Sequence, residues 1–253
     1  MAMAYLDSES ILLFIRLMIA HLLGDFVLQR TTWINDRRVR KWRSTGLYLN
    51  AGIIAVLSWA LSGYHYIWTI PLFIFITHLL IDLLKSSVRD SLGMFFADQA
   101  MHLAVTIAAV YLYTFNMTSG YSCCALVFAS PDLWILAIAY LVVLWPMGIV
   151  ISKLTLPWQQ ESNQPDGLKD AGRYIGMLER LLILTFIFVN QFSAIGFLIA
   201  AKSILRFGDI RESNNRKGAE YILLGTMISF SAAIFTGIIA QWLLRMLHNS
   251  ALL

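Results

Sequence analysis

Apolar and polar residues follow one another along the chain in long blocks. Eight apolar runs are separated by short polar or basic segments, and the expected spans are residues 10–29, 46–61, 67–84, 95–115, 133–151, 175–189, 192–205 and 221–247. Since about 20 apolar residues in a helix cross a bilayer, this pattern predicts an all-α, polytopic transmembrane helical bundle of about eight spans. The run 192–205 is short, and seven spans remain if it is re-entrant.

The composition supports a membrane protein. Of the 253 residues, 58% are hydrophobic and 13% are charged, whereas soluble domains are about a quarter charged. We therefore expect one integral membrane domain over residues 1–253.

The distribution of Lys and Arg predicts the orientation of the bundle. Basic residues concentrate in the loops after the first, third, fifth and seventh spans, and the loops after the second, fourth and sixth hold none. By the positive-inside rule, loops 30–43 and 153–173 are cytoplasmic and both termini lie on the other side. We expect the basic loops to contact membrane lipid. We expect no nucleic acid partner, because no basic stripe is interleaved with exposed aromatic residues.

A polar stripe interrupts the first apolar run. His21, Asp25 and Gln29 are spaced four residues apart, which places them about 40° apart around a helix. The same His/Asp spacing recurs twice, so the pairs are His21/Asp25, His78/Asp82 and Asp98/His102. With the predicted topology, all three pairs lie toward the cytoplasmic ends of their spans.

Three imidazoles and three carboxylates at one depth are a ligand set for one or two divalent metal ions. Mixed nitrogen and oxygen ligands favour Zn²⁺, Mn²⁺ or Fe²⁺. The expected metal ligands are His21, Asp25, His78, Asp82, Asp98 and His102. Gln29 and Gln99 are expected to orient these ligands. The alternative is that the pairs are interhelical hydrogen bonds and ion pairs that only hold the bundle together.

A second polar cluster lies in the C-terminal half and comprises Glu179, Arg180, Lys202 and Arg206. Glu179 can pair with Lys202 or Arg206, and the remaining cations can bind an anionic substrate such as a phosphate. The alternative is snorkelling at the membrane interface together with structural ion pairs.

The motifs H-x3-D-F-x2-Q, H-L-L-I-D-x2-K and D-Q-x2-H resemble an uncharacterised family of bacterial polytopic membrane proteins, a domain of unknown function. The resemblance covers residues 15–115 well, and stretches such as A-K-S-I-x-R-F resemble the C-terminal half of longer members. The family is similar, more distantly, to membrane-bound metal-dependent hydrolases. It implies an integral membrane fold and, by analogy, a metal-assisted hydrolase. We expect a multi-pass protein of the bacterial inner membrane. Its pattern has a histidine near Asn50, and the loss of that imidazole weakens a two-metal site more than a one-metal site.

The leading hypothesis is a metal-dependent hydrolase acting on a lipid or lipid-linked phosphate at the cytoplasmic leaflet. A carboxylate that does not bind the metal would accept the proton of the attacking water, and the catalytic candidates are Asp25, Asp82 and Asp98. Two alternatives stay open. One is a proton- or ion-coupled transporter-like module, and the other is a membrane subunit that docks a cytoplasmic partner through its loops. A homo-oligomer is also compatible with the sequence.

Overall fold

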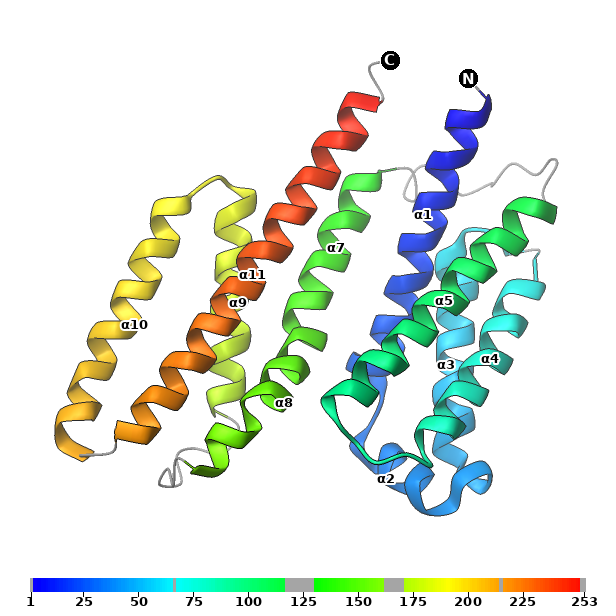
Figure 1. Ribbon diagram of the computed structural model, residues 1–253. Coiled ribbons are helices and arrows are strands. Elements are labelled where there is room, and N and C mark those ends of the chain that lie inside the picture. Colours follow the sequence, from blue (N-terminus) through cyan, green and yellow to red (C-terminus); the bar gives the residue numbers. More distant parts are fainter. Residues whose placement is uncertain (1, 66, 117–129, 162–170, 214–215, 251–253) are drawn as a thin grey trace. The chain divides into compact units, whose positions relative to one another are not determined.

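The structure is a computed structural model, and every regular element in the part of the chain that it describes is a helix (Figure 1). It describes residues 2–65, 67–116, 130–161, 171–213 and 216–250, except the side chains of 2–9, 114–116, 205–213, 216 and 249–250. The all-α class predicted from the apolar runs is therefore confirmed. The helices form two compact units, Met1–Ile138 and Ala139–Leu253, within what the sequence predicted as one membrane domain.

Unit 1 is a bundle of four long helices. Its elements are α1 (Ala2–Leu22), the π-helical turn η1 (Leu23–Leu28), α2 (Thr31–Arg40), the short 3₁₀ turn η2 (Lys41–Arg43), α3 (Thr45–Ser62), α4 (Thr69–Lys85), α5 (Leu92–Asn116) and the start of α7 (Pro131–Leu144). Helices α1, α3, α4 and α5 form a closed ring, because α3 packs on α1 and α4, and α5 packs on α4 and α1 (Figure 1). Leu13, Leu17 and Ile54 fill the centre of this ring.

Unit 2 contains the end of α7 together with α8 (Pro146–Glu161), α9 (Ala171–Phe188), α10 (Phe192–Ser213) and α11 (Arg216–Ser250). Helix α11 packs on α8 and α9, and α10 packs on α9. The core of this unit includes Ile183, Leu184 and Ile187, which are fully buried. A Cβ atom on Gly237 of α11 would lie 2.6 Å from Ile187 Cδ1, so glycine allows α11 and α9 to approach closely.

Five helical segments are long and apolar enough to cross a membrane. They are Ser10–Leu28, Thr45–Ser62, Leu92–Tyr113, Pro131–Glu161 and Lys217–His248. We therefore treat the chain as a membrane protein. The other three predicted spans coincide with α4, α9 and the apolar part of α10, Phe192–Ile204. The total of about eight spans stays a prediction.

The junction between α7 and α8 shows why Pro146 is tolerated. Proline has no N–H group and interrupts helical hydrogen bonding, so backbone carbonyls near it need other donors. Arg180 of α9 supplies them, because its Nε donates to Val143 O at 2.7 Å and its Nη2 donates to Leu144 O at 3.3 Å. Its Nη1 also donates to Ser229 Oγ at 3.2 Å. The buried guanidinium thus connects three helices of unit 2.

Replacing Gly24 with alanine is expected to destabilise unit 1. The new Cβ would overlap Ile54 Cγ1, so the Ile54 side chain or the packing of η1 on α3 would have to shift. Overpacking of this kind costs about 1–3 kcal/mol. Gly52→Ala is the matched control, since no heavy atom lies within 4 Å of its Cβ position. Thermal melting of both purified variants in detergent measures the difference, and an equal loss of stability would contradict the packing described here.

Candidate metal centre

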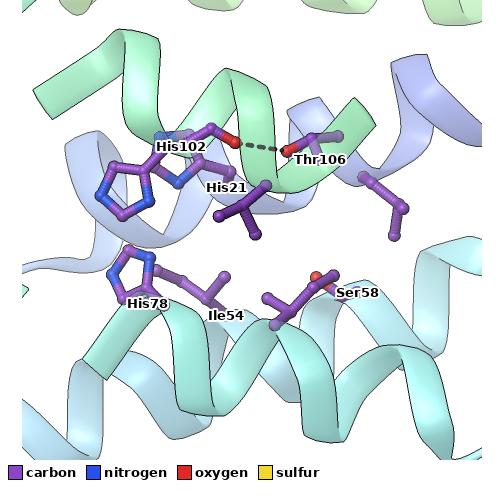
Figure 2. A pocket seen from close by; sticks show the side chains of 9 residues that line it. His21, Ile54, Ser58, His78, His102 and Thr106 are labelled. Carbon is purple, nitrogen blue, oxygen red and sulfur yellow. Dashed lines mark hydrogen bonds between the residues drawn. The ribbon is translucent and has the colours of Figure 1, made fainter. Parts of the chain in front are cut away.

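Three histidines from three different helices meet inside unit 1. His21 lies in the last turn of α1, His78 in α4 and His102 in α5, and each is at most 3% exposed. The ring centroid of His102 lies 4.4 Å from that of His21 and 4.3 Å from that of His78. Figure 2 shows His21 and His102 facing His78 across a small cavity. The closed ring of helices thus brings together side chains that are far apart in the sequence.

Each histidine lies near the carboxylate four residues away, as the spacing predicted. The atom pairs are His21 Nδ1 and Asp25 Oδ2 at 3.9 Å, His78 Nε2 and Asp82 Oδ2 at 3.5 Å, and His102 Nε2 and Asp98 Oδ1 at 3.6 Å. The helices add a contact that the sequence did not predict, because His78 Nε2 also lies 3.4 Å from Asp25 Oδ1. All three carboxylate side chains are at least 95% buried.

The donor atoms fit a divalent ion. One atom from each of His21, Asp25, His78 and His102 lies within 4.8 Å of the others, and a second group consists of Asp82, Asp98 and His102. Two ligands of a tetrahedral ion with bonds of about 2.1 Å are roughly 3.4 Å apart, which matches the separation of His78 from Asp25. Within the part of the chain that the structure describes, neither ring nitrogen of His21 makes a hydrogen bond, and His102 Nε2 makes none. These buried residues could therefore hold a metal ion.

Asp25 lies in the π-helical turn η1 rather than in a regular α-helix. Single π-helical turns inside helices are rare and are frequently found at functional sites. The turn ends at Leu28, and Gln29 has an extended backbone with ψ of 123°. Gln29 therefore leaves the stripe that the helical spacing predicted for it. Gln99 does contact a candidate ligand, because its Nε2 donates to Asp98 Oδ2 at 3.1 Å.

Two cations belong to the site although the sequence gave them other roles. Arg37 and Lys85 were expected to set topology and contact lipid, but Arg37 is only 4% exposed and donates to Asp82 Oδ2. Lys85 Nζ donates to Asp98 Oδ2 at 2.5 Å. The sequence offered only a weak signal for this, namely unpaired carboxylates predicted at the same membrane depth as basic residues.

Asn50 of α3 lies among the candidate ligands. Its side chain is buried, and its Nδ2 donates to Asp25 Oδ1 at 2.8 Å and to Asp82 Oδ2 at 3.4 Å. The same nitrogen lies 3.2 Å from His78 Nε2. The position where the sequence lacks an expected histidine is thus inside the site, and a neutral amide fills it.

The histidines border a cavity of about 10 Å³, which Figure 2 shows from close by. Its other walls include Ile54, Ser58 and the hydroxyl-bearing Thr106, whose Oγ1 donates to His102 O at 2.9 Å. A volume of this size holds about one water molecule. Ser58 Oγ and both ring nitrogens of His21 are buried and have no hydrogen-bond partner among the described residues.

The C-terminal cluster forms one of the two predicted pairs. Lys202 Nζ donates to Glu179 Oε2 at 2.6 Å, which confirms the first of the two partners expected for Glu179. Arg180 donates to the carbonyl groups near Pro146, a structural role. The side chain of Arg206 lies outside the described residues. Anion binding by this cluster stays a prediction.

One known protein family matches the part of the chain that contains the candidate metal ligands. Residues 13–128 match a family model described as "Protein of unknown function (DUF3307)". This confirms the predicted resemblance to an uncharacterised domain, and the matched stretch contains every candidate metal ligand. No curated protein and no solved structure matches the chain.

Removing Arg37 is expected to destabilise the protein strongly. Arg37→Met leaves the Asp82 carboxylate buried without its cation, and breaking a buried ion pair in this way costs about 3–5 kcal/mol. Arg38→Met is the matched control, because Arg38 pairs with Asp90 at 3.3 Å on the exposed surface, where a pair contributes at most about 1 kcal/mol. Melting curves distinguish the two variants, and comparable curves would show that the Arg37–Asp82 pair is not structurally important.

Proposed function

We propose that unit 1 is an intramembrane metal centre that hydrolyses a lipid or lipid-linked phosphate. The observation that carries the proposal is the convergence of four donor atoms, from His21, Asp25, His78 and His102, within 4.8 Å of one another. Buried ionisable groups in a membrane protein are costly and are by default functional. Helical bundle proteins commonly build metal sites from such inward-facing side chains.

The donor set favours Zn²⁺, Mn²⁺ or Fe²⁺, since imidazole ligands disfavour Ca²⁺ and Mg²⁺. A bound ion of this kind supplies Lewis acidity and lowers the pKa of a coordinated water. The protein contributes a buried surrounding with room for about one water molecule, and carboxylates that can accept a proton. Asp82 and Asp98 lie next to His78 and His102 and are the candidates for that role.

The proposed substrate follows from the charges beside the centre. The Lys85 side chain is 29% exposed, so the site reaches the surface beside a cation. The exposed residues of α2 and η2 next to it include Arg38, Arg40 and Arg43. A phosphate group at the membrane surface would meet this positive charge. By the positive-inside rule, these arginines support a cytoplasmic side for this end of unit 1, and the proposed location is a bacterial inner membrane.

A further row of buried polar residues bears on the transporter-like alternative. Buried polar residues continue from Asn50 along α3 through Ser58 and Ser62. Arg16 joins them, because it is 4% exposed and its Nη1 donates to Ser62 O at 3.3 Å. A buried arginine repels protons and metal cations, as positive groups do in selective pores. This arrangement favours the hydrolase over a cation-conducting path.

Metal analysis of the purified protein tests the proposal. We expect a divalent ion in the wild-type chain and its loss in His78→Ala and His102→Ala, which remove ligands. His65→Ala is the matched control, since His65 is exposed in the link between α3 and α4. Inductively coupled plasma mass spectrometry measures the content after dialysis against metal-free buffer. A metal-free wild-type protein, or equal content in all three variants, would contradict metal binding at this site.

Hydrolysis is tested separately on vesicles that contain phospholipids and lipid-linked phosphates. We expect release of phosphate or of a phosphorylated head group, abolished by a chelator and restored by the metal found in the protein. A metal-loaded protein that releases nothing but shows pH-dependent ion flux would favour the transporter-like alternative.

A further inference from the structure

We infer that the centre binds a single metal ion through His21, Asp25, His78 and His102, and that Arg37 and Lys85 take the place of a second ion. The inference rests on the proposed metal binding and narrows it. The sequence offered six ligands for one or two ions. In the structure, the three candidate carboxylates differ in whether a lysine or arginine contacts them, and this difference separates ligands from their neighbours.

The three carboxylates have different partners. Asp82 Oδ2 accepts from Arg37, and the two side chains are 1% and 5% exposed. Asp98 Oδ2 accepts from Lys85 at 2.5 Å. The contacts of Asp25 among the described residues are the imidazoles of His21 and His78 and the amide of Asn50. Asp25 is therefore the carboxylate whose charge no lysine or arginine compensates.

The sum of these charges limits the number of metal ions. The three carboxylates and the two cations that contact them leave one net negative charge in the buried site. One divalent ion changes this to one net positive charge, which a bound hydroxide or an anionic substrate neutralises. A second divalent ion would raise it to three, in surroundings that screen charge poorly.

The positions of the donor atoms alone do not distinguish one metal ion from two. Asp82 Oδ1 and Asp98 Oδ1 are buried and have no hydrogen-bond partner in the described segments of the chain. Together, Asp82, Asp98 and His102 form a second group of possible ligands. A second ion there would lie next to Arg37 and Lys85 and would compete with the first ion for His102. Repulsion from both cations therefore argues against a second ion.

This assignment gives Arg37 and Lys85 a defined role. They hold Asp82 Oδ2 at 3.5 Å from His78 Nε2 and Asp98 Oδ1 at 3.6 Å from His102 Nε2, so these two aspartates position the imidazoles by charge without binding the metal themselves. Partners of this kind tune affinity by about 10–100-fold when they are altered. Loss of a true ligand has a larger effect.

The test compares three variants of the full-length chain, each titrated with Co²⁺ and Zn²⁺. Asp25→Asn removes a proposed ligand. The double variants Arg37→Met/Asp82→Asn and Lys85→Met/Asp98→Asn remove an entire ion pair, which leaves no lone buried charge and preserves the fold better than a single change. Bound metal per chain and the visible absorption of Co²⁺ are the readouts, and circular dichroism checks folding.

We expect one ion per wild-type chain even with excess metal. Both double variants should keep one ion with an affinity within about 100-fold of wild type, and Asp25→Asn should lose more than this. Two ions per wild-type chain would overturn the inference of a single ion. Loss of the ion in either double variant that still folds would overturn it as well. Both results would leave the proposed metal binding intact. No ion in the wild-type chain would overturn the proposed function itself. If Asp25→Asn does not fold, the number of ions per wild-type chain and the metal content of the double variants still test the inference of a single ion.

Discussion

Compensation of buried charge is the constraint on which unit 1 depends. Three carboxylates and three imidazoles lie inside a ring of apolar helices, where an unpaired charge is expensive. Arg37 satisfies Asp82 from α2, and this helix is consequently held against the end of the bundle, where Lys41 also donates to Ser86 O at 2.5 Å. The basic segment after the first span thus has a structural function in addition to its expected effect on orientation.

The same constraint shapes unit 2 with different residues. There the costly features are the proline at the start of α8 and the carboxylate of Glu179, and their partners are Arg180 and Lys202. Every nitrogen of the Arg180 guanidinium contacts a protein acceptor, which explains why an arginine is buried at that position. The two units therefore use buried cations for separate purposes, one beside candidate metal ligands and one at a helix break.

Much of the architecture was predictable because apolar length and four-residue spacing are local properties. They gave the helices and the three His/Asp pairs. The partners of Arg16, Arg37 and Lys85 were not predictable, since each is contributed by a different helix and depends on which helices pack together. The π-helical turn at Asp25 and the extended backbone at Gln29 have the same origin, because packing of η1 on α3 near Gly24 sets the local backbone.

X-ray absorption at the metal edge tests the central claim most directly, because it counts ligands by type in the loaded protein. The geometry described here predicts three imidazole nitrogens and one carboxylate oxygen from the protein at about 2.0–2.2 Å, with the strong outer-shell scattering that imidazole rings produce. An oxygen-only coordination shell without imidazole scattering would contradict the claim that His21, His78 and His102 form a single metal centre.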